Sequence, residues 1–454
     1  MRPKRKRVFR SVACGAIIAT CCSHAIAGGL GGVLGGGGSG ILGFPGALPG
    51  TAGHALSSLS LPGVPGVPSI PLGPIVPGLG SLGQIGRGLS VSTDTVGRPI
   101  DAGAVVRNNI GEPVVRGELV AISPSNADLD AAKRLGFEVT GSDRLEALNL
   151  TTVSLAPPPG MTETEALRAV RNADPSGNFD FDHIYDPSGV ELATTAPPAK
   201  GARLLRLYAR GVSVGMIDAG IDTDHPSLAG AQIETQNVTD NARPPVTAHG
   251  TAVASLLVGD DKSFRGQLPG ATLYAVDAFG GSRTGGSAVD IARALEWLAE
   301  KRVAVVNASL AGPPNALLAA AVHAFITSGH ILVAAAGNAG PAAPPAFPAA
   351  YSGVVGVTSV DSARHLQIDA NRGDVAFAAL GVNIRAASLD GYGVYTGTSF
   401  AAPIVAGRFA ILMPAPDPKA SEAARAELVR AAERLGNQAI YGYGYVGPTA
   451  LAAE

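Results

Sequence analysis

The sequence predicts an α/β protein in which a parallel sheet with helices on both faces follows a smaller α+β unit. Between residues 203 and 454, short apolar segments rich in β-branched residues alternate with helical segments. This alternation is typical of a parallel sheet that is covered on both faces. A second, separate series of strand and helix patterns fills residues 101–195. Hydrophobic residues make up 46% of the 454 residues, so the chain can supply a large core.

The first 27 residues have the pattern of a secretory signal peptide. A basic stretch, MRPKRKRVFR, precedes a short apolar run and an Ala25-Ile26-Ala27 sequence that favours cleavage after Ala27. The apolar run is too short to cross a bilayer, which takes about 20 residues, and no later segment qualifies as a stable transmembrane span. We therefore expect an exported protein, either secreted or held in the periplasm or cell envelope. A lipoprotein signal that ends at Cys21 is the alternative.

Cysteine usage and charge exclude several classes of site. Cys14, Cys21 and Cys22 all lie in the predicted signal, so the mature chain would have no disulfide, no zinc-thiolate site and no cysteine nucleophile. The net charge of -2 with 15% charged residues gives no sign of a nucleic-acid partner.

Residues 28–100 are predicted to be a low-complexity spacer rich in glycine and proline. From Pro62 to Pro77 a proline recurs at every third position, which suits an extended polyproline II segment. Glycine does not keep the collagen repeat, since Ser69 and Leu72 interrupt it. A semi-rigid spacer is therefore expected, with a ligand for a partner's aromatic groove as the alternative.

Residues 101–195 are predicted to form a ferredoxin-like unit. The expected order is β-α-β-β-α-β, with strands at 114–123, 137–141, 145–155 and 178–185 and helices at 126–136 and 162–174. The second helix has a capping box, Thr162 with Glu165. A linker rich in proline and alanine follows at 194–202.

The domain at 203–454 is predicted to contain the parallel sheet. Its expected strands are GVSVGMID (211–218), ATLYAVDAF (271–279), VAVVNASL (303–310), HILVAAAGN (330–338) and GVVGVTSV (353–360). Its expected helices are residues 250–259, 288–302 and 315–329. Active residues gather at the carboxyl ends of the strands of such a sheet. Asp218, His249, Asn338 and Ser399 each follow a predicted strand or begin a predicted helix.

The segments around these four residues resemble the signature blocks of the subtilisin-like serine proteases. The blocks are MIDAGIDTDHP, AHGTAVAS, VVNASLAGP, AAAGNAG and GTSFAAP, in that order. The chain order of Asp, His and Ser is the subtilisin order. The resemblance covers about residues 205–450, and the unit before it resembles the propeptide of these enzymes by pattern. Each residue alone could be a turn, cap or packing residue, but the ordered set of five blocks favours catalysis.

The resemblance implies a secreted serine endopeptidase that is made as a self-processed precursor. Ser399 would be the nucleophile, His249 its base, and Asp218 the group that orients His249. Asn338 and the backbone N–H of Ser399 would stabilise the oxyanion. Ala252 stands where the family has a second histidine, a position that carries no proton in the reaction.

Peptide substrates are expected to bind by strand addition along two stretches of the domain. One stretch includes Ser309, Leu310 and Ala311, and the other runs along residues 333–336, so that the substrate-binding residues would also include Ala335, Ala336 and Gly337. The alanines and Leu310 favour an apolar primary pocket.

No cofactor and no metal site are expected, and calcium is possible but not indicated. Asp222, Asp224 and His225 could suggest a metal cluster, although their spacing better fits a solvated loop.

The expected partners are protein or peptide substrates and the chain's own propeptide. Self-cleavage is expected between about Asp186 and Arg206, after the propeptide has blocked the site with its C-terminal tail. Two rival functions remain open at this point. One is a catalytically idle binding protein of the cell envelope on the same fold, and the other is a serine peptidase that uses Ser, Glu and Asp at acid pH.

Overall fold

The computed structural model describes residues 104–193, 209–242, 244–282 and 285–448. All of them fall within one structural unit, Ser58–Glu454. The predicted signal peptide and the glycine- and proline-rich spacer lie outside the described residues, as does the predicted linker.

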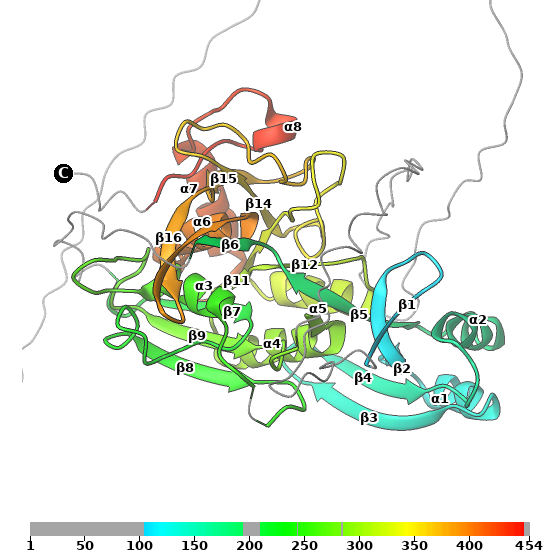
Figure 1. The fold of residues 1–454 in the computed structure, drawn as a ribbon. Helices are drawn as coiled ribbons and strands as arrows, with labels where there is room; N and C mark the ends of the chain where they lie inside the picture. The colour runs from blue at the N-terminus through cyan, green and yellow to red at the C-terminus, as the bar shows by residue number, and fades with distance from the viewer. Residues whose placement is uncertain (1–103, 194–208, 243, 283–284, 449–454) are drawn as a thin grey trace, which may run out of the picture. The chain divides into compact units, whose positions relative to one another are not determined.

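The N-terminal part of the described chain has the predicted ferredoxin-like topology. Its elements are β1 (Val105–Arg107), β2 (Pro113–Ile122), α1 (Asn126–Arg134), β3 (Glu138–Leu145), β4 (Leu150–Ala156), α2 (Glu163–Ala173), β5 (Phe179–Pro187) and β6 (Val190–Ala193). The strand order is β5-β2-β4-β3, with β1 paired to β2. We call residues 104–187 the N-terminal domain. In Figure 1 it is drawn in cyan and blue-green.

Local sequence explains the two helices of the N-terminal domain. Ser125 caps α1 and Thr162 caps α2, each in a complete capping box with the residue three positions on. One expected strand differs: residues 146–149 form a turn instead of the start of the strand predicted at 145–155. Asn149 has a φ of 52° there, a left-handed conformation that asparagine tolerates better than most residues.

The C-terminal part of the chain, from residue 209, is built on the predicted parallel sheet. Its strands run in the order β15-β14-β13-β11-β7-β9-β8, and every neighbouring pair is parallel. They are β7 (Ser213–Asp218), β8 (Gln232–Asn237), β9 (Thr272–Asp277), β11 (Val305–Ala308), β13 (Ile331–Ala335), β14 (Val355–Val360) and β15 (Phe377–Leu380). The predicted strands of this domain are confirmed.

Short strands and helices complete this domain. The short strands are β10 (Gly286–Ser287), β12 (Leu310–Ala311), β16 (Ile384–Ser388) and β17 (Gly391–Thr396). The helices are α3 (Ala248–Val258), α4 (Ala288–Glu300), α5 (Ala316–Thr327), α6 (Thr398–Leu412), α7 (Pro418–Ala431) and α8 (Gln438–Tyr441).

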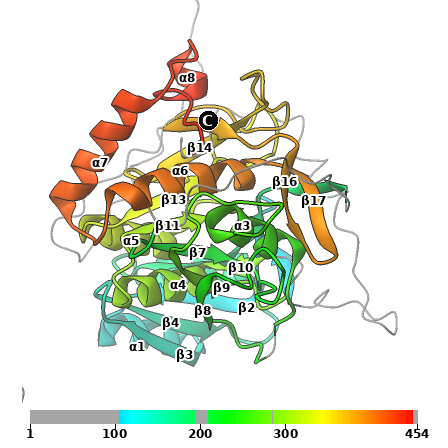
Figure 2. The ribbon, with the colours of Figure 1, turned by 90° about the vertical axis from the view of Figure 1, so that its left-hand side faces the viewer.

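The helices cover both faces of the parallel sheet, as the sequence predicts. Helices α3 and α6 pack on one face in a core cluster with residues such as Met216 and Val333, and α4 and α5 pack on the other with residues such as Ile217 and Val306. The side chains of neighbouring residues on one strand therefore pack in core clusters on opposite faces of the sheet. Figure 2 shows α6 above β13 and β11, and α4 below β7.

The N-terminal domain packs against α4 and α5. One face of its sheet is covered by α1 and α2, whose core includes Phe137 and Leu167. The opposite face supplies Val120, Ile122 and Leu150 to the same cluster that contains α4 and α5. The two sheets therefore share this pair of helices as a common middle layer.

Polar contacts fix the position of the N-terminal domain on these helices. The Glu296 carboxylate on α4 accepts hydrogen bonds from the backbone N–H groups of Ala147 and Leu148 at 2.7 and 3.0 Å. Arg293 on the same helix forms an ion pair with Asp143 at 2.7 Å. These bonds hold the turn between β3 and β4 and the strand before it.

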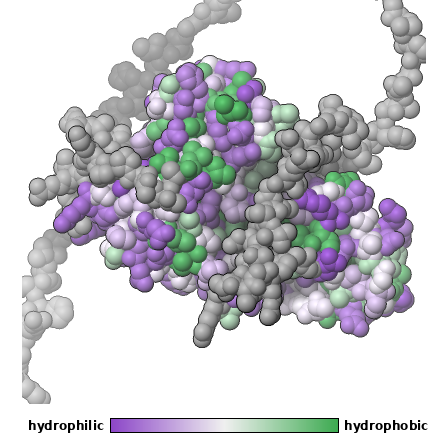
Figure 3. All heavy atoms as spheres, viewed as in Figure 1, coloured by the Kyte–Doolittle hydropathy of each residue, from purple (hydrophilic) through white to green (hydrophobic). Residues whose placement is uncertain are grey.

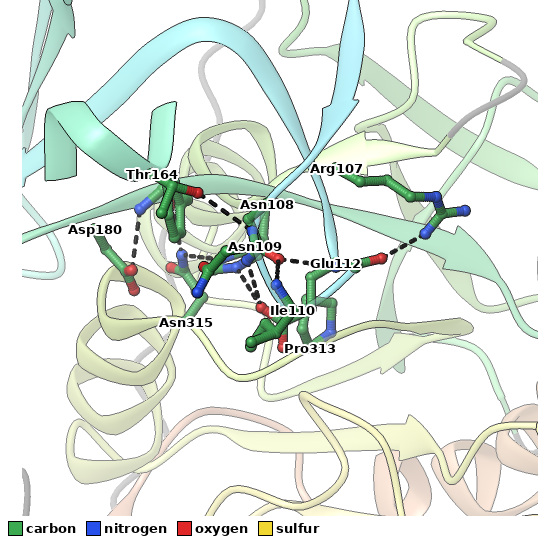
Figure 4. A network of polar contacts seen from close by, with 12 residues as sticks. Arg107, Asn108, Asn109, Ile110, Glu112, Thr164, Asp180, Pro313 and Asn315 are labelled. Atoms are coloured by element: carbon green, nitrogen blue, oxygen red, sulfur yellow. Dashed lines mark hydrogen bonds and ion pairs between the residues drawn. The ribbon is translucent and has the colours of Figure 1, made fainter. Parts of the chain in front are cut away.

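Two aspartates of β5 contact the first turns of α4 and α5. Asp182 accepts a hydrogen bond from the N–H of Val289 at 3.1 Å, and Asp180 accepts one from Ala316 at 2.7 Å. The first N–H groups of a helix have no partner within the helix, and its N-terminus favours negative charge. Figure 4 shows Asp180 near Asn315, which precedes α5, in a polar network with Asn108 and Glu112.

One face of the described chain shows no large apolar patch (Figure 3). In Figure 3 the apolar residues on the visible face occur in small groups between hydrophilic ones. Among the described residues, no helix has both the length and the apolar character needed to cross a membrane.

Replacing Glu296 with alanine should weaken the attachment of the N-terminal domain. The N–H groups of Leu148, which is buried, and of Ala147 would lose their acceptor, and an unsatisfied buried donor costs about 1–3 kcal/mol. We expect a melting temperature a few degrees lower in thermal denaturation of the full chain. Glu300→Ala, on an exposed position of the same helix, is the control. Equal melting of the two variants would show that Glu296 does not hold the domain.

Candidate active site

Asp218 and His249 are joined by a short hydrogen bond. Asp218 is the last residue of β7 and is fully buried, and His249 is the second residue of α3, whose N-cap is Thr247. The distance from Asp218 Oδ1 to His249 Nδ1 is 2.8 Å. A carboxylate only accepts hydrogen bonds, so Nδ1 carries the proton and Nε2 is left as a base. His249 Nε2 is buried and makes no hydrogen bond to any described residue.

Ser399 lies in the first turn of α6, where the N-terminus of the helix provides a positive field. It is fully buried, and its hydroxyl donates a hydrogen bond to the carbonyl of Ser309 at 3.1 Å. The Ser309 hydroxyl in turn donates to the Ser399 carbonyl at 2.9 Å. The serine side chain must therefore rotate from this position before it can give its proton to His249.

Asn338 follows β13 and lies beside the start of α6. Its Oδ1 accepts hydrogen bonds from the backbone N–H of Thr398 and from Gln367 Nε2, both at 3.1 Å. Its Nδ2 donates to the hydroxyl of Ser188 at 2.9 Å. The amide nitrogen of Asn338 thus points toward the residue that directly follows the N-terminal domain.

The chain that leaves the N-terminal domain runs directly through this site. The carbonyl of Ser188 accepts a hydrogen bond from the backbone N–H of Ser399 at 2.9 Å, and the N–H of Ser188 donates to the carbonyl of Ser309 at 3.3 Å. A carbonyl that contacts the N–H of Ser399 occupies the place where an oxyanion would form. Ser188 is therefore held as a peptide residue in front of Ser399.

The residues before Ser188 form an antiparallel strand with two edges of the C-terminal part. Pro187 pairs with Leu310 and Asp186 with Ala311 on β12. Tyr185 and Ile184 pair with Gly286 and Ser287 on β10. The end of β5 thus lies between β12 and β10 as a middle strand, which is the geometry of a peptide bound by strand addition.

The residues after Ser188 are also paired. Strand β6 runs antiparallel to β17, with Val190 opposite Thr396 and Glu191 opposite Tyr395. Gly189 lies between the two paired segments, where an added Cβ atom would collide with the ring of Phe400. Only glycine fits this position without a shift, so the backbone passes very close to the start of α6.

The predicted substrate-binding residues fall into two groups. Ser309, Leu310 and Ala311 lie along the bound strand. Residues 333–336 do not form the second edge: β13 lies inside the parallel sheet between β11 and β14, and Ala335 and Ala336 are fully buried. The backbone N–H of Gly337 donates to Thr398 Oγ1.

Gly286 and Ser287 form the second edge, and the sequence does not predict them. A strand of two residues is too short to show the alternation of apolar and polar residues by which strands are predicted from sequence. The only sequence signal is the pair of glycines before α4, which allows the backbone to approach another strand closely.

Tyr185 fills a buried pocket beside this edge. It is fully buried, and its hydroxyl donates to the carbonyl of Pro313 at 2.8 Å. Burial raises its pKa well above the ordinary value, so the hydroxyl keeps its proton and remains a donor. The third residue before Ser188 is thus held both by packing and by a hydrogen bond.

Carboxyl groups are concentrated where β5 meets α4. Burial, and the nearby carboxylates of Glu118 on β2 and Asp290 on α4, raise the pKa of Asp182 well above its ordinary value. Burial raises the pKa of Asp290 to about 6, although Arg293 opposes the shift. The interface of the N-terminal domain therefore favours protonated carboxyl groups.

The loop after Asp218 is held by local contacts. Both ring nitrogens of the buried His225 are engaged, with Ser227 Oγ at 2.8 Å and the carbonyl of Gly391 at 2.7 Å. Asp222 accepts a hydrogen bond from the N–H of Asp224. In the part of the chain that the structure describes, no three His, Cys, Asp or Glu side chains are grouped so that they could hold a metal ion.

Comparison with known proteins points to one family. Residues 209–444 match the model of the subtilase family. The chain is 32% identical over 255 residues to Subtilisin E of Bacillus subtilis (strain 168), a match that covers 53% of this chain and 65% of that protein. It is also 32% identical over 255 residues to Subtilisin of Bacillus pumilus, covering 53% of this chain and 90% of that protein.

A solved structure supports the fold. Fervidolysin from Fervidobacterium pennivorans, described as a keratinolytic enzyme related to subtilisin, superposes with a TM-score of 0.61 at 21% identity. The match covers 76% of this chain and 62% of that one, so it extends beyond the part that matches the family model.

Proposed function

Because this chain belongs to the subtilase family, we propose that it is an exported serine endopeptidase made as a self-processed precursor. Asp218, His249 and Ser399 hydrolyse peptide bonds in this proposal, and no cofactor takes part. The observation that carries it is the peptide of Ser188, whose carbonyl lies on the N–H of Ser399 beside the hydrogen-bonded pair of Asp218 and His249.

In the proposed reaction each of these groups has its own role. Ser399 Oγ attacks the substrate carbonyl carbon and gives its proton to His249 Nε2, while Asp218 stabilises the imidazolium. The oxyanion is stabilised by the N–H of Ser399 and by Asn338 Nδ2. The intermediate collapses when His249 protonates the leaving amine. Water then hydrolyses the ester on Ser399 by the same route, with His249 again as base.

The first substrate is the chain itself, and the bond that is cut is Ser188–Gly189. Pairing on both sides of Ser188, with β12 and β10 before it and β17 after it, holds this bond in front of Ser399. It lies within the window expected from the sequence. The N-terminal domain acts as the propeptide, which occupies the cleft until it leaves.

The side chains of the segment that ends at Ser188 also suggest which substrate residues the site prefers. Ser188 is a small polar residue, so we revise the expectation of a purely apolar preference at the position before the cut. Tyr185 contributes a large aromatic side chain with a hydroxyl that has a fixed acceptor. Substrates with an aromatic residue, tyrosine above all, three positions before a small residue are favoured.

Replacing Ser399 with alanine should abolish hydrolysis of casein and leave the precursor uncut. The nucleophile and its base act as one unit, and in a subtilisin the loss of either lowers turnover by about 10⁶-fold. The measurement is casein hydrolysis together with the mass of the purified chain. His249→Ala should match it. If Ser399→Ala still cleaves casein at the wild-type rate, Ser399 is not the nucleophile; a wild-type chain that hydrolyses nothing would favour an idle binding protein.

Replacing Gly189 with valine should prevent the cut between residues 188 and 189. The added side chain would collide with Phe400 and displace the bond from Ser399. We expect uncut precursor by mass spectrometry, whereas the wild-type product should begin at Gly189. Val190→Ala, at a largely exposed neighbouring position, should be cut normally. A wild-type product that begins at any other residue would refute this assignment of the cleaved bond.

The cut N-terminal domain should leave the peptidase more readily as the pH rises. Asp182 has a raised pKa when docked and an ordinary one, near 4, when solvated. The docked state therefore binds protons more tightly, so docking is strongest at acid pH and weakens as the pH rises. The neighbouring Asp290 adds to this effect, and its share is lost as the pH rises through its docked pKa of about 6.

Gel filtration of the cut chain between pH 5 and pH 8 measures this release. Each unit of pKa shift corresponds to a tenfold change in affinity, so we expect at least a tenfold weakening over this range. Asp182→Asn should reduce the dependence, because the amide does not titrate, and the part that comes from Asp290 should remain. Release that increases toward acid pH would contradict the sign of the effect.

A further inference from the structure

Asn338 is held by two donors on its oxygen, and only one of them comes from the backbone. The N–H of Thr398 and the side chain of Gln367 both donate to Oδ1 at 3.1 Å. Thr398 belongs to the GTSFAAP block and is part of the start of α6. Gln367 lies outside all five blocks, and no sequence pattern singles it out.

Gln367 is fixed in place by its own backbone. It lies in the connection between β14 and β15, where its N–H donates to the carbonyl of Ser359 at 2.9 Å and its carbonyl accepts from Ala370 at 3.2 Å. Its side chain is buried, with 7% of the residue exposed. Its side chain contacts the site through the hydrogen bond to Asn338, so we expect it to affect the reaction through the Asn338 amide.

The orientation of the Asn338 amide depends on these bonds. The last torsion of an asparagine side chain has a broad, roughly two-fold preference, so the torsion itself does not determine which end faces Ser188. An N–H donor can contact only the oxygen. Two donors on Oδ1 therefore turn Nδ2 toward Ser188, where it donates to the hydroxyl at 2.9 Å.

We propose that Gln367 is a positioning residue that acts through Asn338. It holds the Asn338 amide so that Nδ2 faces the reacting carbonyl and can stabilise the oxyanion. This inference rests on the proposed function. Gln367 does not touch the substrate. Its donor also polarises the Asn338 amide, since hydrogen bonds in a chain strengthen one another, so that Nδ2–H becomes a better donor as negative charge forms on the oxyanion.

Replacing Gln367 with leucine tests this role by removing the donor at similar volume. The loss of one of two orienting hydrogen bonds should lower kcat by about 2- to 10-fold. The KM of a peptide substrate should hardly change, because Asn338 acts on charge that develops only in the transition state. Ile368→Ala, at an adjacent exposed position, should leave both constants unchanged.

Replacing Gln367 with glutamate supplies a second test in a side chain of nearly the same shape. At neutral pH its carboxylate cannot donate to Oδ1 and repels it, so kcat should fall at least as far as in the leucine variant. Below the pKa of the new carboxyl group the protonated form can donate again. The ratio of the variant's kcat to that of the wild type should therefore rise as the pH falls.

Gln367→Leu in an Asn338→Ala background distinguishes a positioning role from a general effect on the stability of the fold. If Gln367 acts only through Asn338, Gln367→Leu should lower kcat no further in that background. Three results would overturn the inference and leave the proposed function intact. They are an equal fall in kcat in both backgrounds, a change confined to KM, and a kcat ratio of Gln367→Glu to wild type that does not depend on pH. A wild-type chain without hydrolytic activity would overturn both.

Discussion

Helix α6 has almost no exposed face, and this constraint organises the rest of the molecule. From Thr398 to Ala410 its residues are buried, with Arg408 as the partial exception. A helix that is hydrophobic all round belongs in the interior. It packs against β11, β13, β14 and β15 and against α3, so its N-terminus cannot move without disturbing the core. The serine at that N-terminus, Ser399, is therefore positioned by the packing of the whole domain.

The small residues of α6 make this burial possible. Ala401, Ala402 and Gly407 let neighbouring segments approach closely, and an added Cβ atom at Gly407 would lie 2.6 Å from Gln267. Pro403 is the sixth residue of α6 and lies inside the helix, so the carbonyl of Ser399 lacks the usual N–H donor four residues on and accepts a hydrogen bond from the Ser309 hydroxyl instead. The same tight approach brings Gly397 to Gly189, where an added Cβ atom would be 2.5 Å from the neighbouring Cα. Core packing and access of a peptide to Ser399 thus depend on the same small side chains.

Local pattern makes part of this structure predictable from the sequence. Asp218 and Asn338 follow apolar strands, and the β-α-β-β-α-β order is visible through the capping boxes at Ser125 and Thr162. Contacts between distant segments leave no such pattern. Ser188 meets Ser399 from a remote part of the chain. Glu296 looks like an ordinary glutamate on a helix surface until the turn between β3 and β4 reaches it.

The pairing of β6 with β17 has a consequence for the energetics of the proposed self-cleavage. Hydrogen bonds hold the chain on both sides of the Ser188–Gly189 bond, so the new amine and the new acyl group stay together at an effective concentration in about the millimolar range or above. Resynthesis of the bond then competes with hydrolysis, and the cut and uncut forms can approach equilibrium. In the proposed maturation, the irreversible event is the departure of the N-terminal domain. The interface with α4 and α5, more than the chemistry at Ser399, then sets the time at which the active enzyme appears.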